Sequence, residues 1–365
     1  MIKVLHLMRS LSAGGIGTFI MNNYRSIDRE IMQFDFAITH GGMGEYGAEI
    51  EEKGGQIFFI STEGNRSFFD GVKQLVNLYK LCKKNKYDVI HCHYYFANAY
   101  FLSIAKWAGI KIRVSHCHNT RTKEVGLFKK IFESFSRKIL LKAGTDFLGC
   151  SDAATIFLYG QKAFDTGVAK TLYNGIDFSY WNKSNINIRL TKEKYHIKDE
   201  KVFLFVGRLE EQKNPIFALE VVRAVYRKMN NFKFLFVGEG SYYERVKDYI
   251  SSNYMNEYVT LLPANSDIRE LQAIADIMIA PSLWEGLGIA YLEAQKMETM
   301  VFASDQVPKE VDMGYCKFLS LSNKAVWESA IIKFLNNDKK TLELVKPERF
   351  DISHTVKELL NVYTK

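Results

Sequence analysis

The feature that most constrains the fold of this chain is an alternation, sustained along its length, between short apolar runs and longer helix-like stretches. Runs such as 202–206 are apolar at every position, which is typical of strands buried on both faces of a parallel sheet. The alternation therefore predicts an α/β protein. The expected strands are 2–8, 34–39, 56–60, 89–92, 112–116, 147–150, 202–206, 234–237, 259–262, 277–280 and 300–303.

The alternation pauses over residues 174–200, where the chain is polar and begins with an Asn-Gly turn signal. A length of 365 residues is enough for two domains. We predict two doubly wound, Rossmann-like domains that face each other across a cleft, with ligands bound outside the carboxyl ends of the strands. The predicted divisions are 1–172, 173–345, and a C-terminal helix in 346–365 that packs back on the first domain.

Composition narrows the class of protein further. Hydrophobic residues make up 47% of the chain, as in an ordinary globular protein, and no apolar run is long enough for a membrane-spanning helix. The apolar N-terminus lacks a basic region and a cleavage site, so we expect a buried strand there and no signal peptide. Five scattered cysteines indicate free thiols in a reducing, cytoplasmic compartment. The net charge of +8 permits nucleotide sugars, anionic lipid or nucleic acid as partners.

The most specific motif begins at residue 281, directly after an expected strand, and reads Pro-Ser-Leu-Trp-Glu-Gly-Leu-Gly-Ile-Ala-Tyr-Leu-Glu-Ala. Gly286 and Gly288 permit a tight loop, and a helix is expected to begin near Leu287. The free N–H groups and positive dipole end of a helix suit a diphosphate. Glu285 and Glu293 are placed to accept hydrogen bonds from hydroxyl groups at opposite ends of one ligand. A glycine turn before a surface helix is the alternative.

A second motif, which is cationic, follows the first expected strand in the second half of the chain. Arg208 and Lys213 lie in the expected strand-to-helix loop, where they can converge on phosphates or remain solvated surface cations. Asn214 and Pro215 suit the N-cap and first position of the next helix. Gly238 lies in another glycine-rich turn, where close backbone approach to a nucleobase is one interpretation.

In the first half, the sequence Gly14-Gly15-Ile16-Gly17 follows the first expected strand. It matches neither the dinucleotide-binding fingerprint nor a P-loop. It can bring the backbone close to a phosphate or a sugar, or it can be a plain tight turn.

Histidines end two further strands, as His91-Cys92-His93 and His116-Cys117-His118. Residues two apart in a strand share a face, so each histidine pair can point together with its cysteine turned away. These side chains can form a zinc site, line a substrate cleft or serve as structural histidines. With no ligating carboxylate evident, we favour the cleft lining.

Residues 123–142 form a candidate amphipathic helix. One side collects Leu127, Phe128, Ile131, Phe132, Phe135 and Ile139, and we expect this aromatic side to pack on the sheet of its own domain. The opposite side carries Lys129, Lys130 and Arg137. These cations are expected to contact an anionic membrane.

Taken together, these motifs resemble glycosyltransferase family 4, the retaining transferases of GT-B fold. The resemblance spans almost the whole chain, from the first glycine motif through Asp88-Val89-Ile90-His91-Cys92-His93, His118-Asn119 and Asn174-Gly175-Ile176-Asp177 to Gly207-Arg208-Leu209 and the Glu-x7-Glu element 285–293. The stretch 304–311 is similar to the branch that builds capsules and exopolysaccharides.

The resemblance implies transfer of a hexose or N-acetylhexosamine from a UDP-sugar, bound by the second domain, to a glycan or lipid-linked acceptor, bound by the first. No divalent metal, other cofactor or nucleic acid is expected. Arg208 and Lys213 would hold the diphosphate, Glu293 the ribose and Glu285 the donor sugar, with His118 at the anomeric centre; His116 is the alternative. The full set expected to bind the nucleotide sugar is Gly15, Gly17, Arg208, Lys213, Gly238, Glu285, Gly286, Leu287, Gly288 and Glu293.

Two positions depart from the family pattern. Asn119 stands where an aspartate is usual, and the Gly-x-Pro turn after the Glu-Ala helix is replaced in the segment 296–301. Three rival classes stay open: a nucleotide-dependent dehydrogenase, a GT-B sugar-nucleotide epimerase, and a catalytically silent partner of another transferase. A transferase at the inner face of the cell membrane is the expectation carried forward.

Overall fold

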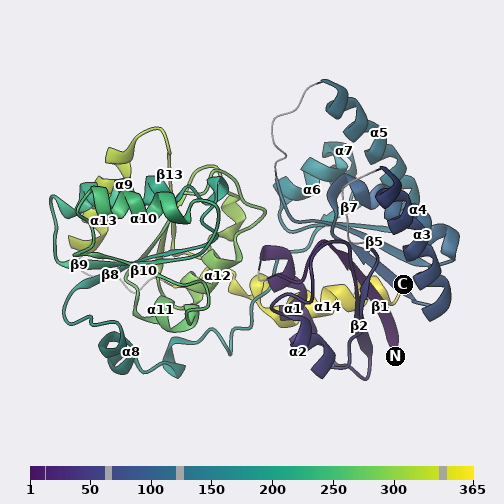
Figure 1. Cartoon of the computed structure of the whole chain (residues 1–365), viewed down its shortest axis with the longest axis horizontal. Coiled ribbons are helices and arrows are strands. Elements are labelled where there is room, and N and C mark those ends of the chain that lie inside the picture. Colours follow the sequence, from purple (N-terminus) through teal and green to yellow (C-terminus); the bar gives the residue numbers. More distant parts are fainter. Residues whose placement is uncertain (13, 62–67, 121–126, 337–342) are drawn as a thin grey trace. The chain divides into compact units, whose positions relative to one another are not determined.

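The computed structural model describes residues 1–12, 14–61, 68–120, 127–336 and 343–365, and it divides into two compact units (Figure 1). Unit 1 comprises Met1–Gly175 with Arg349–Lys365, and unit 2 comprises Ile176–Glu348. Each unit has its own parallel sheet. The predicted α/β class is therefore confirmed. Among the described residues, no helix has the length and apolar character needed to cross a membrane.

The sheet of unit 1 has seven parallel strands in the order β3-β2-β1-β4-β5-β6-β7. The central strand β1 pairs with β2 on one side and with β4 on the other, in a register that sets His6 beside His91. Histidines of separate strands therefore meet in the middle of the sheet. The strands are β1 (Ile2–Met8), β2 (Met32–Ile38), β3 (Ile57–Phe59), β4 (Val89–Cys92), β5 (Ile112–Cys117), β6 (Asp146–Gly149) and β7 (Ala169–Thr171).

Helices cover this sheet. Helix α14 arrives from the far end of the sequence and packs against α1, which makes the last residues part of unit 1 (Figure 1). Helix α4 packs between α3 and α5. The helices of unit 1 are α1 (Gly15–Ser26), α2 (Gly47–Glu52), α3 (Phe68–Asn85), α4 (Asn98–Ala108), α5 (Leu127–Ala143), α6 (Asp152–Tyr159), α7 (Gln161–Asp165) and α14 (Ile352–Tyr363), with the 3₁₀ turns η1 (Tyr95–Ala97) and η5 (Pro347–Phe350).

The sheet of unit 2 has six parallel strands in the order β10-β9-β8-β11-β12-β13. Its core contains stacked phenylalanine pairs between β8 and β9, with ring centroids 4.1 Å apart for Phe203 and Phe232. The strands are β8 (Lys201–Val206), β9 (Phe232–Val237), β10 (Val259–Leu262), β11 (Ile277–Ala280), β12 (Met300–Ser304) and β13 (Cys316–Leu319). The helices are α8 (Ile188–Lys194), α9 (Pro215–Tyr226), α10 (Tyr243–Ser252), α11 (Ile268–Ile274), α12 (Ile289–Lys296) and α13 (Lys324–Asn336), with η2 (Lys183–Asn185), η3 (Glu211–Lys213) and η4 (Lys309–Val311).

The predicted orientation of α5 is wrong. Its aromatic side faces solvent: Ile131, Phe132 and Phe135 are 59%, 51% and 60% exposed. The buried side consists of smaller residues, with Ser136 and Leu140 both fully buried. The reason is that α5 packs closely against its neighbour α4, and this contact accommodates small side chains better than phenylalanines. The side chains of residues 127–130 lie outside the described part of the chain.

Arg137 also departs from its predicted place on an outward basic side. Its guanidinium donates hydrogen bonds to the carbonyl oxygens of Phe157 and Leu158, at 3.0 and 2.9 Å, near the end of α6. It also lies over the ring of Phe96, 5.6 Å from the centroid. A cation at the C-terminal end of a helix offsets the negative end of the helix dipole. Arg137 therefore joins α5 to α6, and the expectation that it contacts a membrane is withdrawn.

Candidate active site

The loops expected to bind a donor meet at one point of the unit 2 sheet. The strand order reverses between β8 and β11, since β9 and β10 follow β8 on one side and β12 and β13 follow β11 on the other. The loops after β8 and β11 leave the same edge of the sheet at this switch point. Open α/β sheets bind ligands at such a point.

These two loops are joined by a polar cluster around Lys213 and Glu285. The Lys213 Nζ lies 2.5 Å from Glu285 Oε1, and their side chains are only 16% and 8% exposed. Gln212 links the same loops through its backbone and side chain, donating from Nε2 to the carbonyl of Trp284 at 3.0 Å. Arg208 donates to Gln212 Oε1 at 3.2 Å and is otherwise exposed. The structure thus brings together three of the predicted residues: Arg208, Lys213 and Glu285.

The glycine loop leads into a helix whose first turn is open. Helix α12 begins at Ile289, two residues later than predicted, after Gly288 in a left-handed conformation with φ of 98°. Its N-cap makes no side-chain hydrogen bond, so the first N–H groups are available to an anion. Gly286 is buried, and Leu287 is part of the hydrophobic core.

Glu293 lies within α12, and its burial raises the pKa of the carboxyl to about 8. Within the described part of the chain, no group donates a hydrogen bond to this carboxyl. A partly buried carboxylate that lacks a donor is suited to accept hydrogen bonds from ligand hydroxyl groups. The assignment of Glu293 to the ribose hydroxyl groups stays a prediction.

The structure gives Gly238 a packing role. A Cβ atom on Gly238 would lie 2.0 Å from the carbonyl oxygen of Gly207, in the neighbouring loop. Close approach of the two loops therefore requires glycine at this position whether or not a nucleobase binds. Asn214 precedes α9 and Pro215 is its first residue, as predicted, but Asn214 is left-handed and forms no side-chain cap.

In unit 1, the glycine motif supplies the N-cap and first turn of α1, which is the element that follows β1. A Cβ atom on Gly15 would meet no atom within 4 Å, so this backbone is open to a ligand. A Cβ atom on Gly17 would lie 2.3 Å from the carbonyl oxygen of Ser12. Gly17 is therefore needed by the loop itself, whereas Gly15 is not.

Five histidines gather where β1, β4 and β5 end. The pairs predicted to share a face do so, with ring centroids 4.3 Å apart for His91 and His93 and 4.0 Å apart for His116 and His118. The fifth, His6, lies on β1 and was not predicted, although a histidine within the otherwise apolar run 4–8 is an unusual feature. His116 is buried within β5, and His118, beyond the strand, is partly exposed. His118 is thus the better placed of the two to meet a ligand.

Hydrogen bonds connect these rings in two series. His118 Nε2 lies 2.8 Å from His93 Nδ1, and His93 Nε2 lies 3.1 Å from His6 Nδ1. His116 Nδ1 lies 3.2 Å from His91 Nε2, and His91 Nδ1 lies 2.6 Å from the hydroxyl of Tyr363. Burial lowers the pKa of His118 to about 3 and that of His6 to about 3. The rings are therefore neutral at physiological pH, and neutral rings can accept hydrogen bonds or coordinate metal.

Two subsets of this cluster have spacings that a metal ion could use. They are His6 with His91 and His93, and His93 with His116 and His118; in each set the ligand atoms lie within 4.8 Å of one another. The neutral state of the rings suits zinc chemically. The hydrogen bonds between the rings account for most of the same nitrogens without a metal.

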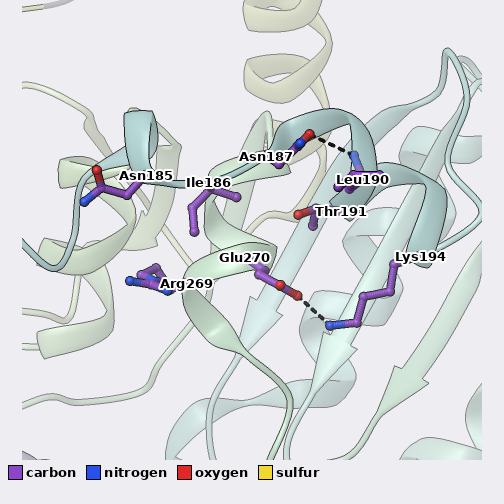
Figure 2. Close-up of a pocket in the computed structure, with 8 residues that line it drawn as sticks. All are labelled: Asn185, Ile186, Asn187, Leu190, Thr191, Lys194, Arg269 and Glu270. Carbon is purple, nitrogen blue, oxygen red and sulfur yellow. Dashed lines mark hydrogen bonds and ion pairs between the residues drawn. The ribbon is translucent and has the colours of Figure 1, made fainter.

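A pocket of about 270 Å³ lies elsewhere in unit 2, between α8 and α11 (Figure 2). An ion pair between Lys194 and Glu270, 2.6 Å apart, crosses its wall, and Arg269 lies on the same side as Glu270. None of the residues predicted to bind a donor lines this pocket.

Family models match both units. A model described as "Glycosyltransferase Family 4" matches residues 13–180, and one described as "Glycosyl transferases group 1" matches residues 187–349. Together they span nearly the whole chain. The chain therefore belongs to the group 1, family 4 glycosyltransferases, and it is a transferase.

Curated relatives agree with this assignment. The chain is 27% identical to "Putative glycosyltransferase EpsF" of Bacillus subtilis (strain 168), over 99% of this chain and 96% of that protein. It is 26% identical to "Capsular polysaccharide biosynthesis glycosyltransferase CapH" of Staphylococcus aureus, over 100% and 99%. It is 26% identical to "UDP-Gal:alpha-D-GlcNAc-diphosphoundecaprenol alpha-1,3-galactosyltransferase" of Escherichia coli, over 80% and 77%. The general role is glycosyl transfer in capsule or polysaccharide biosynthesis.

A solved structure confirms the fold. "Anabaena Alr3699/HepE in complex with UDP and glucose" matches with a TM-score of 0.83 over 100% of both chains, at 16% identity. The predicted GT-B architecture, with two Rossmann-like units, is therefore correct.

Proposed function

We propose that this transferase moves a hexose or N-acetylhexosamine, with retention of configuration, from a UDP-sugar to a glycan or lipid-linked oligosaccharide in surface polysaccharide assembly. The observation that carries the proposal is the cluster of Arg208, Lys213 and Glu285 beside the open first turn of α12. A cluster of this kind can bind a diphosphate and a sugar side by side.

Stabilisation of the departing diphosphate is the chemical task that this cluster suits. Negative charge grows on the phosphate oxygens as the glycosidic bond breaks, and fixed donors aimed at that charge lower the barrier. With donor bound, the Lys213 ammonium would contact phosphate as well as Glu285. The Glu285 carboxylate would then accept hydrogen bonds from the hydroxyl groups of the donor sugar.

The remaining roles follow the resemblance residue by residue. Glu293 would hold the ribose hydroxyls and His118 would act at the anomeric centre, through a neutral ring whose Nε2 is engaged by His93. UDP as the nucleotide is supported by the UDP bound in the Anabaena structure. A lipid-linked acceptor, reached at the inner face of the cell membrane, is supported by the acceptor in the name of the Escherichia coli relative.

A thermal-shift screen against UDP-, GDP- and dTDP-sugars tests the donor, because a ligand that binds only the folded chain raises its melting temperature. We expect a rise with UDP-sugars that Lys213→Ala reduces. Product analysis with acceptor should then give the anomer of the donor. Conversion of donor without any acceptor would indicate an epimerase and overturn the proposal.

We also expect transfer to need no divalent metal. Cationic side chains and N–H groups occupy the place where a metal-dependent transferase would offer carboxylates to Mg²⁺ or Mn²⁺. Activity should persist in excess EDTA and should not rise with added manganese. Complete loss in EDTA, restored by zinc, would assign the histidine cluster to a catalytic metal instead.

A further inference from the structure

Three neighbouring helices of unit 1 form a continuous layer. Helix α4 lies between α3 and α5 (Figure 1). Tyr100 of α4 stacks with Phe132 of α5, with centroids 6.3 Å apart, and Lys106 Nζ donates to the carbonyl of Lys142 at 3.2 Å. We call the outward side of these helices the α3–α4–α5 face.

Apolar side chains are concentrated on this face. The three helices comprise 46 of the 365 residues, yet they hold seven of the sixteen large hydrophobic side chains that are exposed in the described part of the chain. Trp107 alone is 72% exposed. An apolar concentration of this kind marks a surface that binds something. The seven residues are Val72, Val76, Tyr79, Trp107, Ile131, Phe132 and Phe135.

Positive charge is concentrated on the same helices. Their sequences contain ten Lys and Arg residues against two acidic ones, Asp70 and Glu133. The resulting excess of eight equals the formal net charge of the entire chain. Arg137, which bonds to α6, is one of these ten cations, and without it the excess is still seven. The lysines with described, exposed side chains are Lys73, Lys80, Lys83, Lys84, Lys106, Lys138 and Lys142.

We propose that the α3–α4–α5 face docks on an anionic lipid bilayer, with its aromatic and aliphatic side chains in the interfacial region and its lysines on the headgroups. Exposed aromatic residues surrounded by lysine are typical of surfaces that lie in a membrane interface. The centre of a protein–protein interface is instead depleted of lysine. This inference deepens the proposed function, in which the acceptor is reached at the inner face of the cell membrane, but it requires neither a particular donor nor a particular acceptor.

The test is co-sedimentation of the full chain with vesicles of phosphatidylcholine and phosphatidylglycerol, without nucleotide or acceptor. Wild type should bind these vesicles and release them as salt rises. Phe132→Ser with Phe135→Ser should weaken binding at least about tenfold. The matched control is Tyr254→Ser, since Tyr254 is 89% exposed in unit 2 and should be dispensable.

A second pair of variants addresses charge. Lys80→Glu with Lys84→Glu, one turn apart on α3, should weaken binding at least about fivefold for each lysine. Lys247→Glu with Lys317→Glu makes the same change in charge on unit 2 and should bind as wild type does. Melting temperatures of all variants should match wild type, because every altered side chain is exposed.

The proposal fails if wild type does not bind anionic vesicles at low salt, or if both α3–α4–α5 variants bind as tightly as their controls. It also fails if wild type is a dimer that Phe132→Ser with Phe135→Ser converts to monomers, because the face would then be an interface between two copies. Transfer to a short soluble acceptor is measured separately. If wild type does not transfer sugar to that acceptor, the proposed function is overturned, whereas the vesicle result still stands.

Discussion

The Lys213–Glu285 ion pair joins two loops of unit 2, and in the proposed function both residues also bind the donor. Removing Lys213 leaves a carboxylate that is only 8% exposed without its cation, which costs stability in addition to activity. Removing exposed Arg208 carries no such cost. The two cations of the cluster can therefore be told apart experimentally.

Arg208→Ala and Lys213→Ala should each raise the activation free energy by about 2–4 kcal/mol and so lower kcat/KM roughly thirtyfold to a thousandfold, because each removes charge stabilisation from the departing diphosphate. Lys213→Ala should also lower the melting temperature, and adding Glu285→Gln should recover much of that loss without recovering activity. Steady-state kinetics and thermal unfolding measure the two effects. Wild-type turnover by both single variants would remove these residues from the donor site.

Glu293 should make the stability of the ligand-free chain depend on pH. Its pKa is about 8 in the folded chain against 4.5 as the ordinary value, so between these pH values the folded state binds more protons than the unfolded state. The free energy of unfolding therefore falls as pH rises through this window. Glu293→Gln abolishes this titration, so its stability relative to wild type should increase by on the order of 3 kcal/mol from pH 5 to pH 8.

Melting temperatures of Glu293→Gln and wild type at the two pH values give this comparison directly, because other titrating groups affect both proteins alike. UDP should bind the variant more weakly at pH 8, where the wild-type carboxylate is ionised. A difference in melting temperature that does not change with pH would show that Glu293 is ionised throughout.

The sequence indicates which residues belong to the candidate site, but it does not indicate the bonds between them. Arg208, Lys213 and Glu285 could be predicted because each lies in a loop after a buried strand. The Lys213–Glu285 bond could not be, since 72 positions separate its partners. His91 and Tyr363, 272 positions apart, present the same difficulty. Gln212 was missed because an uncharged side chain in a loop gives no signal of its own.

At the scale of elements, the turn between α12 and β12 shows how the chain manages without the family's Gly-x-Pro. Glu298 takes the left-handed conformation there, with φ of 62°. Thr299 anchors the turn by donating its hydroxyl to the carbonyl of Gln272 at 2.6 Å. The turn forms, and a side chain occupies a position that favours glycine.

Glu298→Gly should stabilise unit 2 by about 0.5–1 kcal/mol, since relief of left-handed strain exceeds the entropy that glycine adds to the unfolded chain. The ion pair that Glu298 forms with Lys183 at 3.6 Å is largely exposed and contributes little. Thermal unfolding measures the gain. Glu298→Ala, which keeps a Cβ atom, serves as the control, and an equal gain in both variants would contradict the strain argument.

Buried parallel strands were predicted to within one or two residues, because their apolar runs are continuous. The strands missed were β7 and β13, both short, both at a sheet edge and each containing a lysine. The error in α5 has a different cause. Periodicity identifies the apolar side of a helix, but it does not show whether that side meets the sheet, and here Ser136 and Leu140 meet neighbouring helices instead.

At the scale of the whole molecule, the chain enters unit 2 after Gly175 and returns to unit 1 at Arg349. The returning helix α14 is tied to unit 1 by the Tyr363–His91 bond, by Thr355 donating to the carbonyl of Tyr173 at 3.3 Å, and by a contact between Lys365 and Asp146. The last residues therefore complete the histidine cluster. The stability of unit 1 should depend on them more than that of unit 2.

Tyr363→Phe tests this dependence with the loss of one atom. The variant leaves His91 Nδ1 buried without its partner, which should cost about 1–3 kcal/mol. If the units unfold in separate transitions, Tyr363→Phe should lower the melting temperature of the unit 1 transition only. The transition of unit 2 can be recognised as the one whose melting temperature rises in Glu298→Gly. Tyr254→Phe, which removes an exposed hydroxyl, is the matched control. Calorimetry that shows both transitions unmoved by Tyr363→Phe would mean that α14 is held by its apolar contacts alone.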